Sequence, residues 1–375
     1  MEIVVANAVE STWVVIAIAV VVLLVTSRKS QTLRDSILPP EVTQELKGLA
    51  IFTIVFGHIG YFLVDDNRFL FPLSIAAGVG VNLFLFLSGY GLTVGMMKKR
   101  LPALEFYRHR LSKIFIPFWL VLSVFFLMDA FILQRMYPAP YYIRSLFGLF
   151  PRADVAIDVN SVFWYITWIL LYYLLFPFVF SAKRPWLSAL ILFGAGSGLV
   201  LWNPSAWSPV MHLYRVHTIA FPLGMLLAVA LREKENGMNP ALNAIRHFKR
   251  AAPAAVYYGL LIILTTIACY TAYYSGVGQG ALKEQLISIV TTCTLVALFA
   301  LKRFEIGLFA FTGFYSYEIY LLHWPLLSRY DIFYRHTPAW LATVLYLALF
   351  FGLGWLIQKA TTAFEENKLL AVKSK

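Results

Sequence analysis

The chain of 375 residues is 60% hydrophobic and 17% aromatic, and only 13% of its residues are charged. A soluble domain carries about 25% charged residues, so this composition excludes an ordinary water-soluble enzyme or binding domain. The formal net charge is +12, a value that is also common among proteins that bind nucleic acid.

Apolar runs along the chain predict about eleven membrane-spanning helices. A run of roughly 18 to 22 apolar residues can cross a hydrocarbon core about 30 Å thick. In chain order the predicted spans are 11–27, 46–64, 76–97, 114–134, 162–181, 186–202, 216–231, 252–274, 283–301, 307–327 and 339–358. The fold class that follows is an all-α, polytopic transmembrane helical bundle.

The positive charges indicate how the chain is oriented. If the N-terminus lies outside, most of the 31 Lys and Arg residues fall in loops on the cytoplasmic side. The positive-inside rule therefore predicts an external N-terminus and a cytoplasmic C-terminus. Because topology accounts for the basic charge, we expect no nucleic-acid partner. The first apolar run precedes its own positive charges, so we interpret it as a retained helix and not as a cleaved signal peptide.

The stretch KGLAIFTIVFGHIG, from Lys47 to Gly60, contains an ionisable group within an apolar run. Eleven residues separate Lys47 from His58, which on a helix places them within about 20° of one face and about 16 Å apart. Lys47 is expected at the cytoplasmic boundary and His58 near the bilayer midplane. Ionisable groups at that depth usually face the bundle interior or a wet cavity. The alternative is a neutral imidazole bonded to a neighbouring helix, with Lys47 as a topological anchor.

The next predicted span, GVGVNLFLFLSGYGLTVGMMKKR, contains polar side chains among small residues. The small residues favour close helix packing. Asn82, Ser88 and Tyr90 are candidate substrate-binding residues, and bonds between helices are the structural alternative for Ser88 and Tyr90.

A basic amphipathic stretch follows in LEFYRHRLSKIFIPFW, where Arg108, Arg110 and Lys113 precede Pro117. Such a pattern is typical of a helix at the membrane surface. It would also gather cations beside Lys47, and a phosphorylated ligand needs such an arrangement because Arg and Lys pair with phosphate oxygens.

The outer loop at about 135–161 mixes Tyr, Phe and Pro with Arg and Asp. This mixture fits a surface that stacks on sugars, and it fits equally well a segment that rests in the headgroup layer.

Five segments, taken in order, resemble the acyltransferase-3 family. They are Lys47–His58, GVNLFLFLSGYGLT, Arg110–Lys113 with a following proline, FWYITWILLYYLLFP (Phe163–Pro177) and FYSYEIYLLHWPLL (Phe314–Leu327). The resemblance covers about residues 45–330. It divides the chain into an extra N-terminal transmembrane helix and cytoplasmic linker (1–44), a membrane core (45–330), and a last transmembrane helix with a short cytoplasmic tail (331–375).

The resemblance implies an integral-membrane O-acyltransferase of the bacterial cytoplasmic (inner) membrane. Such enzymes take an acyl group, usually acetyl, from cytoplasmic acyl-CoA and pass it to a hydroxyl of an extracytoplasmic polysaccharide or glycolipid. By position, His58 is the essential histidine, and Lys47, Arg110 and Lys113 match the residues associated with acyl-CoA, with Arg108 added as a neighbouring cation.

The sequence departs from the family's usual pattern at three places. Lys47 stands where arginine is common, Lys113 replaces a second arginine, and Asn82 holds a position often occupied by Asp. The last departure weakens any proposal of a carboxylate partner for His58. His58 is then expected to act as a general base or as a transient acyl carrier, and the sequence leaves both roles open.

Further candidates lie on later helices. His323 could line the acceptor side, or it could be an interfacial histidine before Pro325. Tyr317 and Glu318 share its helix, and Glu318 is a candidate partner of His58 or His323. Trp164 is a candidate sugar platform, although it and Trp168 fit an interfacial aromatic belt better. His212 and His217 lack the i, i+4 spacing of a helical metal pair, so we expect no metal.

Alternative functions have their own expected signatures. A secondary transporter would share the many spans and the buried ionisable group, but it would consume no acyl-CoA. The other large family of membrane-bound O-acyltransferases lacks the ordered motifs, and a non-catalytic polysaccharide-export component is a third possibility. The acceptor and the choice of acetyl or succinyl stay open. We expect acyl-CoA to be a donor substrate and not a permanent cofactor, and a separate extracytoplasmic acyl-handling protein is conceivable.

Overall fold

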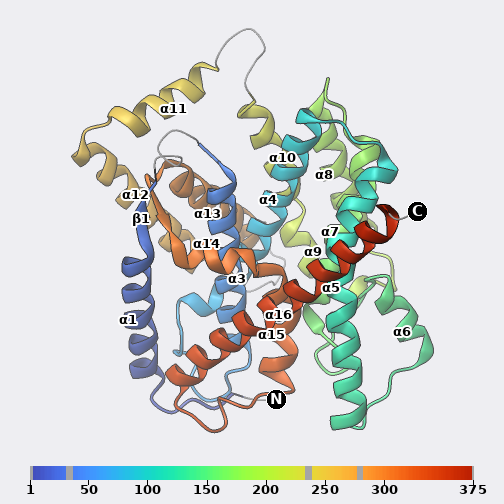
Figure 1. The fold of residues 1–375 in the computed structure, drawn as a ribbon. Coiled ribbons are helices and arrows are strands. Elements are labelled where there is room, and N and C mark those ends of the chain that lie inside the picture. The colour runs from blue at the N-terminus through green and yellow to red at the C-terminus, as the bar shows by residue number, and fades with distance from the viewer. Residues whose placement is uncertain (1–2, 31–36, 233–238, 277–281, 374–375) are drawn as a thin grey trace.

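The structure is a computed structural model that describes residues 3–30, 37–232, 239–276 and 282–373, with side chains except at 241 and 365–373. The linker residues 31–36 and the side chains of the last tail residues therefore lie outside the described part. Helices dominate the chain (Figure 1), which confirms the predicted all-α bundle.

The elements follow one another from the N-terminus to the C-terminus. The α-helices are α1 (Ala8–Thr26), α3 (Pro40–Tyr61), α4 (Ala77–Lys98), α5 (Ala103–Ile132), α6 (Ala139–Leu146), α7 (Trp164–Val179), α8 (Pro185–Trp202), α9 (Met211–His217), α10 (Ala220–Ala230), α11 (Pro240–Ala251), α12 (Ala254–Tyr273), α13 (Leu282–Leu301), α14 (Gly307–Phe314), α15 (Ser316–Ser328) and α16 (Ala339–Lys373). Two short strands, β1 (Ser27–Lys29) and β2 (Phe304–Ile306), pair antiparallel.

Within the described residues, nine helical segments are long and apolar enough to cross a membrane. The two predicted spans missing from these nine are 46–64 and 307–327. The first corresponds to α3, whose N-terminal half carries Glu41, Glu45 and Lys47. The second is broken at Tyr315, whose N–H bonds the Thr312 carbonyl 3.2 Å away, so α14 and α15 are separate helices. The count of eleven spans and the orientation in the membrane stay predictions.

The basic stretch before Pro117 is not a separate surface helix. It forms the beginning of α5, which continues through Pro117 as one helix of 30 residues. A proline inside a membrane helix is tolerated where a neighbour satisfies the backbone groups that it frees. Pro117 leaves the Lys113 carbonyl without its helical donor. The Tyr317 hydroxyl donates to the neighbouring Ile114 carbonyl at 2.8 Å, so α15 contacts α5 at this point.

Helix α3 lies at the centre of the bundle and packs against α4, α14 and α15. A Cβ atom added to Gly48 of α3 would collide with the Phe309 carbonyl of α14, and one added to Gly313 of α14 would collide with the Gln44 carbonyl of α3. The two backbones therefore touch at a crossing beside Lys47, and only glycine fits there.

Three basic segments meet at one end of the bundle. Arg28 of β1 lies 3.7 Å from Glu305 of β2, and Arg303 donates to the Phe248 carbonyl of α11 at 3.2 Å. Figure 1 places β1 and α11 at the same end. The topology prediction assigns all three segments to the cytoplasm, and their proximity agrees with that assignment.

The outer loop folds back on the bundle around α6. Tyr137 and Tyr141 stack with ring centroids 4.7 Å apart, and both are buried. These two tyrosines are therefore packing residues and do not form a sugar-stacking surface. Ile143 and Phe147 stay exposed, as a segment resting in the headgroup layer requires.

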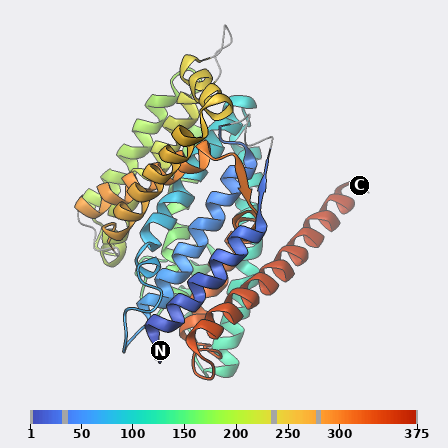
Figure 2. The ribbon, with the colours of Figure 1, turned by 90° about the vertical axis from the view of Figure 1, so that its left-hand side faces the viewer.

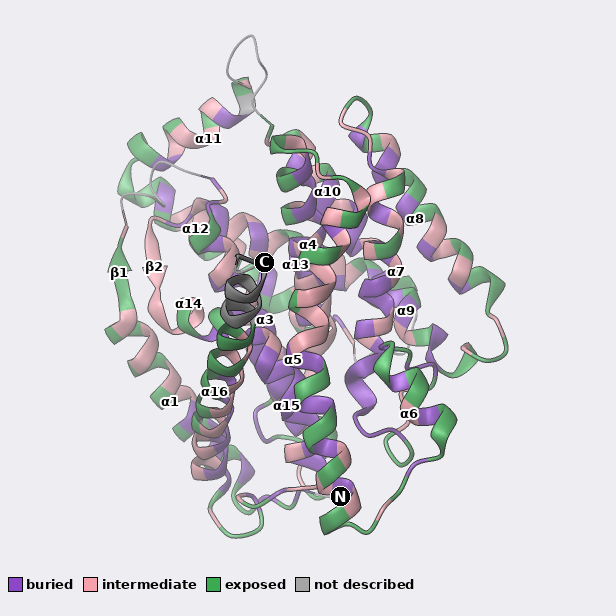
Figure 3. Ribbon diagram, turned by 45° about the vertical axis from the view of Figure 1, so that its right-hand side comes forward, coloured by how far each residue is buried: buried purple, intermediate pink, exposed green. Residues whose placement is uncertain are grey.

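Burial is concentrated in the inner helices. Figure 3 shows buried residues along α15 and α3, whereas long stretches of α1, α8 and α16 are exposed. Helix α16 continues to Lys373 and not only to the predicted end near 358. Figure 2 shows its C-terminal part standing away from the rest of the bundle.

Candidate functional site

His58 and His323 form the centre of the candidate site. His58 Nδ1 lies 2.7 Å from His323 Nε2, and their rings stack with centroids 5.0 Å apart at 10°. His58 is one turn from the end of α3 at Tyr61, and its position near the bilayer midplane stays a prediction. His323 of α15 is completely buried, so it is not an interfacial residue.

The hydrogen bonds of His323 determine the tautomers of both rings. His323 Nδ1 faces two acceptors, the Ile319 carbonyl at 3.1 Å and the Tyr320 carbonyl at 2.9 Å, so this nitrogen carries the proton. In the neutral ring, Nε2 must then accept from His58 Nδ1–H. His58 is left with its lone pair on Nε2, which is the form required of a general base or a nucleophile.

Trp324 holds the His58 ring from a second side. Its ring meets His58 edge-on, with centroids 4.7 Å apart and planes at 87°. Phe62 supports Trp324 in turn at 4.7 Å. The imidazole is thus fixed by one stacked ring and one perpendicular ring, which leaves little freedom for it to rotate.

A small cavity of about 30 Å³ borders His58. On the same measure a water molecule needs about 10–15 Å³, so the space admits a group of only a few heavy atoms. Apart from His58 its walls are apolar or aromatic; they are formed by Ile54, Val81, Phe84, Val162, Trp164, Tyr165 and Tyr320.

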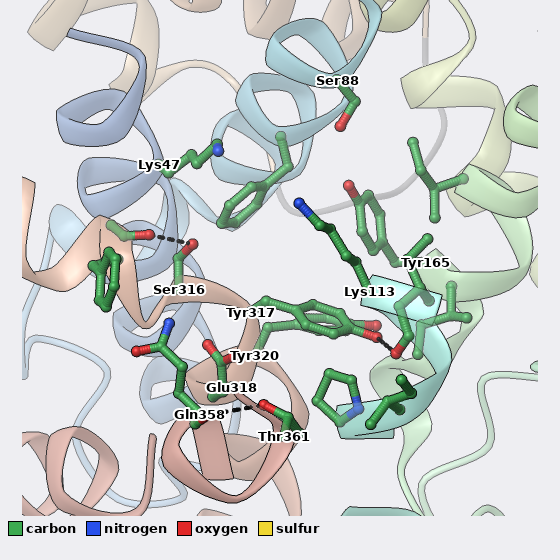
Figure 4. Close-up of a pocket in the computed structure, with 18 of the residues that line it drawn as sticks. Lys47, Ser88, Lys113, Tyr165, Ser316, Tyr317, Glu318, Tyr320, Gln358 and Thr361 are labelled. Carbon is green, nitrogen blue, oxygen red and sulfur yellow. Dashed lines mark hydrogen bonds between the residues drawn. The ribbon is translucent and has the colours of Figure 1, made fainter. Parts of the chain in front are cut away.

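A larger cavity of about 460 Å³ lies beside the N-terminal half of α3, at Gln44 and Lys47. Lys47 of α3 and Lys113 of α5 both line it, and Figure 4 shows their amino groups turned towards the same open space. Arg110 is not in the lining, but its charge and that of Lys113 act on Lys47. Arg108 is exposed and also lies outside the lining.

The two cavities share three wall residues: Phe84, Tyr165 and Tyr320. Tyr165 lies between the other two, with ring centroids 6.5 Å from Phe84 and 5.5 Å from Tyr320. These three rings, hereafter the aromatic partition, border both the space beside Lys47 and Lys113 and the space beside His58.

Three further predicted residues face the larger cavity: Ser88, Tyr317 and Glu318 (Figure 4). Tyr317 uses its hydroxyl to bond Ile114. The hydrogen bonds found among the described residues join Glu318 to neither His58 nor His323. Glu318 is therefore a wall residue of this cavity and not the partner of either histidine.

Three other predicted residues do not line the larger cavity: Asn82, Tyr90 and Trp164. Asn82 is buried, where its Oδ1 accepts from His217 Nδ1 at 2.7 Å and its Nδ2 donates to Ser288 at 2.7 Å. Trp164 stacks on His217 with centroids 5.6 Å apart and borders the small cavity. Tyr90 is half-buried outside both linings.

The interfacial-belt interpretation of two tryptophans is wrong. Trp164 and Trp168 are 8% and 1% exposed, because both lie on the side of α7 that packs against the bundle. Trp164 instead forms part of the wall beside His58.

Sequence reasoning missed three residues that shape the site: Trp324, Tyr165 and His217. Trp324 directly follows His323 in YLLHWP, so its position was visible, but its contact with His58 depends on how α3 and α15 pack. His217 was considered only as a metal ligand beside His212. The structure exposes His212 and buries His217.

Comparison with known proteins gives one match. A family model for an acyltransferase domain, Acyl_transf_3, matches residues 46–359. The match begins in α3, reaches into α16 and leaves α1 outside. The comparisons with curated proteins and with solved structures give no match.

Proposed function

Because the chain belongs to the acyltransferase-3 family and is thus a membrane acyltransferase, we propose that its donor is cytoplasmic acyl-CoA and that its acceptor is a hydroxyl of an extracytoplasmic polysaccharide or glycolipid. The observation that carries this proposal is the pair of adjoining cavities. One is lined by Lys47 and Lys113, the other borders His58, and the aromatic partition lines both.

The larger cavity supports a donor with phosphate groups. Lys47 and Lys113 offer two ammonium groups from different helices, and Arg110 adds positive potential. Charge-assisted bonds of this kind are about twice as strong as neutral ones. The nucleotide phosphates would bind there, and the thioester arm would pass the aromatic partition to reach His58.

His58 would act as the general base. Its Nε2 takes the proton of the acceptor hydroxyl as the oxygen attacks the thioester carbonyl carbon. The new C–O bond forms, the C–S bond breaks, and the proton passes from His58 to the departing CoA sulfur. His323 accepts from Nδ1–H throughout and keeps Nε2 available. The same lone pair would serve an acyl-carrier route, in which an acyl-imidazole forms first.

The small cavity favours acetyl as the acyl group. Its volume of about 30 Å³ suits a small acyl group, and its walls contain no Lys or Arg. A succinyl group would bring a carboxylate into these apolar walls without a partner, which is costly. We place the protein in the bacterial cytoplasmic (inner) membrane, with lipid bilayer around it and the acceptor glycan outside.

Substitution of His58 provides the test. His58→Ala should abolish acylation of surface glycans, measured as alkali-released acetate, while the protein inserts and still binds labelled acetyl-CoA. His109→Ala, which removes a histidine with a 63% exposed side chain on α5, is the matched control and should retain full activity. Full acylation by His58→Ala would refute the assignment.

Two further measurements separate the alternatives. An acid quench during turnover, followed by mass analysis of the peptide that carries His58, distinguishes a carrier from a base, because only the carrier leaves an acylated histidine. Purified wild-type protein that moves a solute without consuming acetyl-CoA would instead be a transporter.

A further inference from the structure

A second large space lies near the loop that joins α15 to α16. A groove of about 770 Å³ is bounded by the N-terminal segment with the start of α1, and by the loop between α15 and α16 with the start of α16. Figure 2 shows the N-terminal end of α1 beside the start of α16. Helix α16 thus borders the donor cavity near Gln358 and this groove at its first residues, Ala339 and Trp340.

The groove connects to the site through direct contacts. The Ile3 N–H donates to the Phe62 carbonyl at 2.7 Å, and the Phe62 ring lies 4.7 Å from Trp324. Trp324 in turn meets His58 at 4.7 Å. One wall of the groove is therefore attached to the residues that hold His58, on the side predicted to face outwards.

The loop that forms the other wall is rigid. The Asp331 carboxylate accepts from the Phe333 N–H at 3.1 Å, the Tyr334 N–H at 3.0 Å and the Tyr346 hydroxyl at 2.6 Å. Tyr334 also bonds Thr343 at 2.9 Å. A binding wall held in this way loses little conformational entropy when a ligand arrives.

The chemistry of the lining favours a sugar chain. Trp340 contributes an aromatic ring to the lining. The polar side chains of the lining provide hydrogen-bond donors, hydrogen-bond acceptors and charges of both signs; they include Asn7, Glu10, Arg335 and His336. A volume of about 770 Å³ falls in the range of ordinary ligand sites. A phosphate headgroup would require cations without a neighbouring carboxylate, whereas Glu10 stands in this lining and Asp331 lies 3.9 Å from Arg335.

We propose that this groove binds the acceptor glycan, as a neutral or weakly charged oligosaccharide segment, and presents its hydroxyl towards His58. This inference rests on the proposed function. Since α1 lies outside the family match, it also assigns α1 a role in choosing the acceptor. Trp340 stacks on a sugar ring, and Glu10 accepts hydrogen bonds from its hydroxyls.

The test compares two tryptophans. Trp340→Ala and Glu10→Gln should each lower acylation of surface glycans at least tenfold in cells, measured as alkali-released acetate per amount of protein. The stabilisation of the purified variants by acetyl-CoA against heat should equal that of the wild type. Trp13→Ala removes a tryptophan of α1 that is 66% exposed and lies outside the groove, and it should acylate like the wild type.

Each other outcome has a definite meaning. Acylation by Trp340→Ala and Glu10→Gln at the wild-type level would overturn the proposal, as would an equal loss in Trp13→Ala. Native mass spectrometry that shows phospholipid bound to the wild type and lost in Trp340→Ala, with acylation intact, would make the groove a lipid site. If the wild type acylates no glycan, the proposed function itself fails.

Discussion

His58 on α3 and His323 on α15 are joined by a 2.7 Å hydrogen bond between residues 265 positions apart. The backbone carbonyls of Ile319 and Tyr320 hold the His323 proton on Nδ1, and this in turn places the lone pair of His58 on Nε2. One turn of α15 therefore decides the reactive form of a ring on another helix.

His323 should accordingly be a positioning residue. His323→Ala should lower the rate of acylation on the order of 10²-fold, the lower end of what general acid–base catalysis contributes, with the KM for acetyl-CoA unchanged. His323→Gln, which keeps a side-chain acceptor, should retain more activity. A wild-type rate for His323→Ala in a purified assay would contradict the tautomer argument.

The donor cavity makes a prediction that depends on phosphate. Lys113→Ala should raise the KM for acetyl-CoA by about tenfold or more, because a hydrogen bond to a charged group contributes about 1.5–3 kcal/mol. With acetyl-pantetheine, which lacks the nucleotide phosphates, Lys113→Ala and the wild type should perform alike. Lys183→Ala, at an exposed lysine outside the cavity, should leave the KM for acetyl-CoA and the KM for acetyl-pantetheine unchanged. An equal defect with both donors would show that Lys113 does not bind phosphate.

The aromatic partition should limit the size of the acyl group. Phe84→Ala removes a ring that lines both cavities and should raise the rate with butyryl-CoA relative to acetyl-CoA by about tenfold, since one methylene in a tight apolar pocket discriminates by about 10–200-fold. Competition between the two donors, followed by mass analysis of the product, measures the ratio. Phe131→Ala, which removes a phenylalanine that is 76% exposed on α5, should leave it unchanged. An unaltered ratio in Phe84→Ala would mean that residues outside the aromatic partition select the acyl length.

The Asn82 position can be tested by restoring the family's usual residue. In Asn82→Asp the Ser288 hydroxyl can turn to donate and His217 Nδ1–H still has an acceptor, so folding and activity should persist. Asn82→Leu leaves both groups without a partner at a cost of about 1–3 kcal/mol each. It should lower the melting temperature in detergent and, through Trp164 stacked on His217, also slow acylation. Equal melting temperatures for the two variants would exclude this network as a support of the site.

Periodicity and residue spacing predicted the helices and the link between Lys47 and His58, because both features are local. α3 is one helix through both residues, and each borders one of the adjoining cavities. The break at Tyr315 was missed because apolar residues continue on both sides of the turn. The His58–His323 pair and the burial of Trp164 could not be read from the sequence, because both depend on which distant helices pack together.

The outer loop offers a test of how burial changes the contribution of an ion pair to the free energy of unfolding. Arg329 and Asp129 are 2.6 Å apart with side chains 15% and 1% exposed, and Arg329 also donates to the Asp158 carbonyl at 2.6 Å. Burial and the hydrogen bond to Asp129 raise the pKa of Tyr137 to about 12, so its phenol stays protonated and donates to the same carboxylate. Loss of the arginine would leave this buried carboxylate without its cation.

Arg329→Ala should therefore destabilise the protein by about 3–5 kcal/mol, the range for removing one partner of a buried pair. The matched control is Arg68→Ala, which breaks a pair with the same 2.6 Å separation but with an arginine side chain 72% exposed. An exposed pair contributes about 0–1 kcal/mol, so this variant should melt close to the wild type. Thermal unfolding of both proteins in one detergent measures the difference. Equal melting temperatures for the two variants would show that the Arg329 cluster does not hold the outer loop.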